Sequence, residues 1–70
     1  MNHVINNSDF VNYEIKHELA GSYGQNEHKS LKVIINVSTN GVKYLVDNVK
    51  MKMADYFLNL NDAIEFYNKY

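Results

Sequence analysis

The stretch LKVIINVSTNGVKYLV, residues 31–46, decides the fold because it predicts two strands joined by a turn. On each side of the turn apolar and polar side chains alternate, which is the pattern of a strand with one buried face. Asn40-Gly41 is the turn signal, because a two-residue type I′ turn needs positive φ at both positions. With this turn Ile35 faces Val46, and the apolar residues of both strands share one face.

Further strands are expected on both sides of this hairpin. Tyr13 to Ala20 alternates strictly, and the polar segment Gly21 to Ser30, which holds two glycines, is expected to be the loop that follows it. Asp47-Asn48 predicts a second two-residue turn and a fourth strand that starts at Val49. A helix from Val49 is the alternative, since Lys, Met, Ala and Leu favour helices, but the strand is the preferred interpretation.

The C-terminal residues predict one helix. Asn59, with Asp62 three residues later, has the form of a capping box. It precedes apolar residues at helical spacing, which are Leu60, Ala63, Ile64 and Tyr67. This stripe is expected to cover the sheet face that carries Ile15, Val33, Ile35, Tyr44 and Val46. We therefore expect one α+β domain over residues 1–70, a small antiparallel β-meander of three to four strands packed on one C-terminal α-helix, with residues 1–12 unassigned.

Composition disfavours several classes of protein. The 70 residues include no Cys, so no disulfide framework can stabilise the chain. No apolar run reaches the roughly 20 residues that span a bilayer, and we expect a cytoplasmic protein without membrane contact. The net charge is −1 and there is no Arg, which makes nucleic acid the less favoured partner.

No group of residues with catalytic or metal-binding chemistry is apparent. His3, His17 and His28 lie in separate segments, and nothing in the pattern brings them within coordination distance. The Ser residues lie in turns or at strand ends, without the strand-to-helix elbow that a nucleophilic Ser uses. We therefore expect no enzyme activity, no metal and no cofactor.

The sheet face away from the helix is the candidate binding surface. Ile34 and Leu45 interrupt its polar alternation on neighbouring strands, and an outward apolar pair favours contact with a protein partner or a second copy of the chain. The candidate contact residues on this face are Ile34, Leu45, Lys43, Lys50, Lys52 and Tyr56. Two other interpretations stay open: a solvated face without function, and a face whose lysines contact DNA phosphates.

Three segments carry a resemblance to a known group of proteins. They are Tyr13-x-Ile15-Lys16, Leu31-x-Val33-Ile34-Ile35-x-Val37 and Asn40-Gly41-x-x-Tyr44-x-Val46. Their order resembles the three-stranded core of small phage anti-CRISPR proteins, which inhibit single-protein RNA-guided nucleases, although the dense acidic surface of the best-known members is missing. The resemblance implies a phage-encoded inhibitor that binds a CRISPR effector nuclease stoichiometrically in the host cytoplasm. The residue usage agrees, because Asn, Lys, Ile and Tyr are specified by A/T-rich codons.

The order of sheet and helix is also similar to the arm-type DNA-binding domains of phage integrases, in which a three-stranded sheet enters the major groove. This second resemblance implies a small DNA-binding domain that uses the lysines of the outer sheet face. The absence of Arg argues against it, because Arg is the residue best suited to guanine edges and phosphates.

Overall fold

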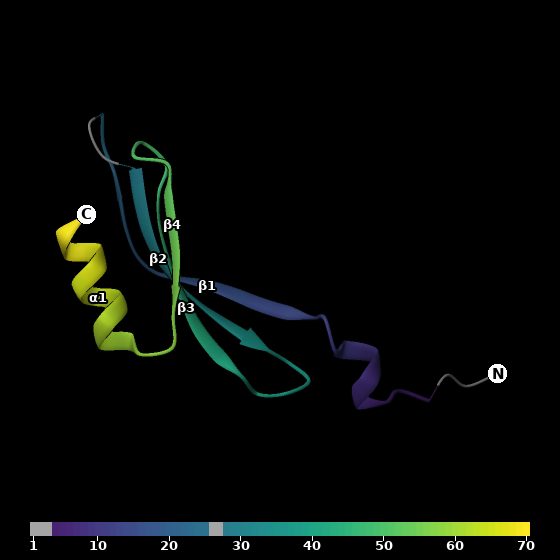
Figure 1. The fold of residues 1–70 in the computed structure, drawn as a ribbon. Helices are drawn as coiled ribbons and strands as arrows, with labels where there is room; N and C mark the ends of the chain where they lie inside the picture. Colours follow the sequence, from purple (N-terminus) through teal and green to yellow (C-terminus); the bar gives the residue numbers. More distant parts are fainter. Residues whose placement is uncertain (1–3, 26–27) are drawn as a thin grey trace.

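A computed structural model of the chain describes residues 4–25 and 28–70. Its elements are the 3-10 helix η1 (Asn7–Phe10), the strands β1 (Glu14–Tyr23), β2 (His28–Asn36), β3 (Val42–Asn48) and β4 (Met53–Phe57), and the helix α1 (Leu60–Lys69). The strands form one antiparallel sheet in the order β1-β2-β3-β4, and α1 lies against one face of it (Figure 1). The predicted α+β meander with one C-terminal helix is confirmed.

The hairpin of β2 and β3 has the predicted faces but not the predicted turn. Ile35 pairs with Val42, which lies four residues before its predicted partner. Because four is an even number, every side chain keeps its predicted face. The loop is longer, at 37–41, because the side-chain oxygen of Asn36 accepts two hydrogen bonds from backbone N–H groups inside it. The turn is not of type I′, since φ of Gly41 is not positive.

β4 is a strand, as preferred from the sequence, but it begins later than predicted. Asn48 pairs with Met53, so a four-residue turn, 49–52, replaces the predicted two-residue turn. The Asn48 side chain is buried, accepts the N–H of Met51 at 3.1 Å and donates to the carbonyl oxygen of Tyr70 at 2.9 Å. These contacts fix Asn48 at the end of the ladder rather than inside a tight turn.

β1 and β2 extend into the segment predicted as a loop. β1 continues to Tyr23 and β2 begins at His28, so most of residues 21–30 lies in strands. The Tyr23 and His28 rings meet edge to face with their centroids 4.9 Å apart, and this contact closes the end of the pair. The register shifts between Glu18 and Ala20, where β1 carries a bulge.

The core lies between α1 and the nearer part of the sheet. Leu31, Val46 and Ala63 are buried together, and four partly buried aromatic residues pack around them: Tyr44, Phe57, Phe66 and Tyr67. Asn59 caps α1, because its side-chain oxygen accepts the N–H groups of the second and third helical residues at 2.7 Å and 3.2 Å. The predicted start of the helix is therefore confirmed.

The buried stripe of α1 differs from the predicted one. Ala63 and Tyr67 face the sheet as expected, but Phe66 joins them, whereas Leu60 and Ile64 stay exposed. A large aromatic ring buries more area than a branched aliphatic side chain, which accounts for Phe66 facing the sheet in place of Leu60 and Ile64.

The sheet projects beyond α1, and the N-terminal segment lies at the projecting end (Figure 1). There the Asn7 side chain donates to the carbonyl oxygen of Ser38 at 3.2 Å, and the Asn36 side chain donates to that of Val11 at 3.1 Å. These bonds attach η1, in the segment left unassigned from the sequence, to the β2–β3 loop. The molecule measures 54 × 24 × 17 Å, and its radius of gyration, 15.4 Å, exceeds the roughly 11 Å of a compact chain of this length.

Candidate protein-binding surface

Ile34 lies on the face turned away from α1, the outer face, but it is not exposed there. Its side chain is only 1% accessible, and it lines the floor of a shallow depression together with Glu14 and Lys43. Lys43 Nζ lies 3.5 Å from Glu14 Oε2 and 4.7 Å from the centre of the Tyr56 ring. This chain of acid, lysine and aromatic side chains spans β2 above Ile34. The prediction of an outward apolar contact is therefore wrong for Ile34, because long neighbouring side chains cover it.

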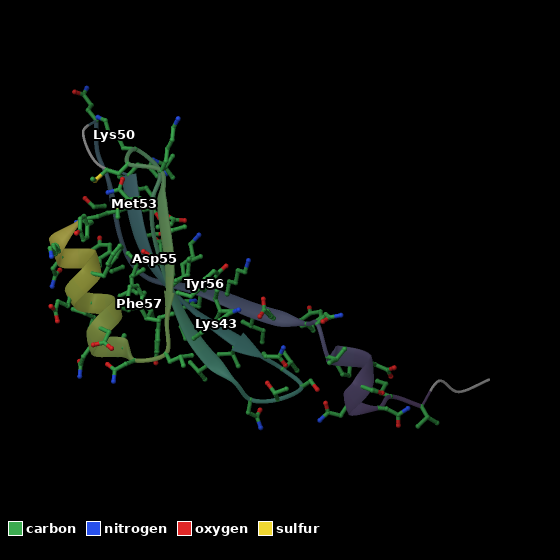
Figure 2. The ribbon with its side chains drawn as sticks, viewed as in Figure 1. Lys43, Lys50, Met53, Asp55, Tyr56 and Phe57 are labelled. Atoms are coloured by element: carbon green, nitrogen blue, oxygen red, sulfur yellow. The ribbon has the colours of Figure 1, made fainter. Side chains whose placement is uncertain are left out.

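Three of the predicted contact residues do lie together on the outer face. Leu45 is half-buried and lies directly opposite Tyr56, which is exposed. Lys43 and Tyr56 point away from α1, whereas Phe57 points toward it (Figure 2). The group consists of Leu45, Lys43 and Tyr56, and it offers little uncovered apolar area because Lys43 lies across the Tyr56 ring.

Lys50 and Lys52 do not belong to this group. Both lie in the turn before β4, and Lys52 adopts the left-handed conformation with φ 55°. Lys50 Nζ donates to the carbonyl oxygen of Gln25 at 3.1 Å, and Figure 2 places it at the opposite end of the sheet from Lys43. Their predicted position on the outer face is wrong, because the turn is two residues longer than expected. The lysines therefore do not form one continuous basic patch.

A different apolar surface lies on the inner face, where the sheet extends past α1. Ile15, Ile35 and Val42 form a row across β1, β2 and β3, with between 37% and 52% of each residue exposed. We call these three residues the projecting apolar surface. The expectation that α1 covers Ile15 and Ile35 is wrong.

The lengths of the elements contain the signal that sequence reasoning missed. A ten-residue helix is about 15 Å long, whereas a strand of ten residues is about 33 Å long. One helix of this length cannot cover an apolar face that follows the whole of β1. Comparison of these lengths would have predicted an uncovered part of the inner face.

The described residues offer little for catalysis. Tyr23 donates its hydroxyl to Glu18, and this bond to a carboxylate raises the pKa of the phenol above its ordinary 10.0. A raised pKa keeps the hydroxyl protonated, the opposite of what a nucleophile or base requires. No group of three His, Cys, Asp or Glu residues in 4–25 and 28–70 could hold a metal ion. His3, one of the three histidines considered, lies outside the described residues.

Two depressions on the described part of the surface are small. The one on the outer face holds about 270 Å³, and the one beside α1, lined by Phe57, Phe66 and Tyr70 among others, holds about 300 Å³. Both are at or below the lower limit for small-molecule sites. Within the described part of the chain, no helix has the length and apolar character that crossing a bilayer requires.

No protein-family model, no curated protein and no solved structure matches this chain.

Proposed function

We propose that the chain is a non-enzymatic protein-binding module that acts by stoichiometric binding through the projecting apolar surface. The observation that carries this proposal is the row of paired apolar residues that α1 leaves uncovered, with Ile35 at its centre between Ile15 and Val42. Exposed apolar residues that form a contiguous patch are typical of protein contact sites, whereas apolar residues scattered singly over a surface are not.

The accessible surface of the chain supports the same proposal. It amounts to 5434 Å², which exceeds by roughly 900 Å² the value of about 4,500 Å² for a compact monomer of this mass. Each partner in a complex of standard size buries about 800 Å². The excess comes from the elongated shape of the chain, and it is similar in size to the area that one protein partner covers.

The proposed target is a single-protein RNA-guided nuclease in the cytoplasm of a bacterial host. This finer proposal rests on the resemblance of the three sequence segments to small phage anti-CRISPR proteins and on the small size of the chain. A stoichiometric inhibitor needs a contact surface and no catalytic group, which agrees with the chemistry of the described residues.

Inhibition of such a nuclease tests the proposal. Equimolar chain, added to a purified nuclease with its guide RNA, should stop cleavage of a matched DNA target and should co-elute with the nuclease. The double variant Ile35→Asp/Val42→Asp should lose both effects, because a charge at an interface must give up its water. Val49→Asp is the control, since Val49 is also apolar and exposed but lies in the turn at the other end of the sheet.

Two results would contradict the proposal. If the nuclease cleaves normally in excess chain and does not co-elute with it, the target is wrong. If the Asp double variant inhibits as well as the unchanged chain, the projecting apolar surface is not the contact. Each variant must first show the circular dichroism spectrum of the unchanged chain.

The DNA-binding alternative stays a prediction from the sequence, and the lysine positions do not favour it. Titration of labelled duplex DNA at low and physiological salt tests it, because each neutralised phosphate adds about 0.9 to the salt slope of the affinity. Tight binding that weakens steeply with salt and disappears in Lys43→Ala would replace the protein-binding proposal with a DNA-binding one.

A further inference from the structure

We propose that the chain forms a two-fold dimer in which β1 of one copy pairs antiparallel with β1 of a second copy. The inference goes beyond the proposed function, because it concerns the edge of the sheet rather than its face. β1 is an edge strand of ten residues, and every residue from Glu14 to Gly21 is exposed. A long uncovered edge presents backbone N–H and C=O groups to which another strand can bond.

The backbone groups of the even-numbered residues point outward along this edge. The N–H of Val37 donates to the carbonyl oxygen of Tyr13 at 3.0 Å, so Tyr13 turns its backbone toward β2. Successive residues of a strand turn their backbone groups to opposite sides. Glu14, Lys16 and Glu18 therefore direct theirs away from the sheet, toward the position of an added strand.

The alternation of charge on these outward residues selects the register. In a two-fold antiparallel pair, the outward residues of one copy must lie opposite outward residues of the other copy. An axis through Lys16 would oppose two lysines and an axis through Glu14 two glutamates, and like charges directly opposite are destabilising. An axis through Ile15 opposes Glu14 to Lys16 of the second copy, twice by symmetry. It also places the two Ile15 side chains side by side on the inner face.

An axis through His17 is the competing register, because it also brings unlike charges together. That register runs into the bulge between Glu18 and Ala20, where regular pairing is interrupted. The axis through Ile15 needs only residues 12–18, which precede the bulge. The bulge and the charges together favour the Ile15 axis.

Pairing in this register has a consequence for the inner face. The row of Val42, Ile35 and Ile15 in one copy continues into the same row of the second copy through the two adjacent Ile15 residues. The two projecting apolar surfaces become one, twice as long. A dimer would therefore offer a protein partner a larger surface than the monomer.

Sedimentation equilibrium over a series of protein concentrations provides the first test. The apparent mass should rise from 8.2 kDa toward twice that value as concentration increases. Lys16→Glu should hold the mass at the monomer value, because it sets two glutamates opposite each other. Glu14→Lys/Lys16→Glu should restore the dimer, since it exchanges the charges within each pair. Under the His17 axis the double variant would not restore it, because the glutamate introduced at position 16 would then oppose Glu18.

Single cysteines provide the second test, and the chain has no native Cys to interfere. Ile15→Cys should form a disulfide dimer under a mild oxidant, because a non-hydrogen-bonded pair has its Cα atoms about 4.5 Å apart, within the range that a disulfide bridges. His17→Cys should not, since the two positions would lie about 14 Å apart along the strands. Cross-linking through His17→Cys but not through Ile15→Cys would show that the axis passes through His17 and not through Ile15. A mass of 8.2 kDa at every concentration, with neither variant cross-linked, would overturn the dimer.

Discussion

Leu31 and Ile35 lie on the same strand and the same face, four residues apart, yet their surroundings differ. Leu31 is buried against Val46 and Ala63, whereas Ile35 pairs with the exposed Val42 where α1 no longer covers the sheet. The comparison divides the sheet into a covered half, which supplies the core, and a projecting half, which leaves apolar residues exposed. The same sequence alternation therefore produces a core in one half and an exposed apolar surface in the other, because α1 covers only the first half.

The largest expected effect comes from Ile34, which is an exception to this division because it is buried on the outer face. Ile34→Asp should destabilise the fold by about 3 to 5 kcal/mol, since it replaces a buried apolar side chain with a carboxylate that must give up its water beneath Glu14, Lys43 and Tyr56. That loss approaches the whole stability of a domain this small. Urea unfolding followed by circular dichroism checks it. A folded variant of unchanged stability would show that Ile34 is not covered.

A matched pair of alanine substitutions sharpens the comparison directly. Leu31→Ala should cost about 2 to 5 kcal/mol, because it opens a cavity in the core. Ile35→Ala should cost less, about 1.5 kcal/mol in the isolated chain, because 37% of the residue is already exposed and no closed cavity forms. The two urea midpoints, measured at low protein concentration, give the difference. Equal losses would mean that the projecting half is as tightly packed as the covered half.

Most of the fold could be predicted from the apolar and polar alternation of the strands and from the N-cap residue of the helix. Every face assignment in β2 and β3 was correct although the register was not, because an even shift changes partners without changing faces. The lengths of the two turns were not predictable from Asn40-Gly41 and Asp47-Asn48 alone, since the side chains of Asn36 and Asn48 bond to backbone N–H groups within the turns.

The candidate site was harder to predict, because it depends on which side chains cover which. Nothing local to Ile34 distinguishes an exposed isoleucine from one that lies beneath the ion pair of two neighbouring strands. Likewise, Ile15 was correctly placed on the inner face, but its exposure follows from where α1 ends. Both errors concern tertiary packing, which a pattern along one strand does not contain.

A smaller effect concerns the element that defines the covered half. Asn59→Ala should destabilise the chain by about 1 kcal/mol, because two N–H groups at the start of α1 lose their acceptor. Asn68→Ala is the control, since Asn68 is exposed near the other end of the helix and Ala is the better helix former. The urea midpoint should fall for the first variant only. A fall of equal size in both would mean that the cap contributes nothing specific.

The smallest expected effect concerns the ion pair of Glu14 and Lys43 in the projecting half. Both side chains are more than a third exposed, at 34% and 40%, so water screens their attraction. A double-mutant cycle with Glu14→Gln and Lys43→Met should therefore give a coupling energy below about 1 kcal/mol, and that energy should shrink as salt is added. A coupling above this value that resists salt would mean that the pair is desolvated, as it would be beneath a bound partner or a second copy. The concentration dependence of the coupling separates these cases, because only a second copy makes it grow with the amount of protein.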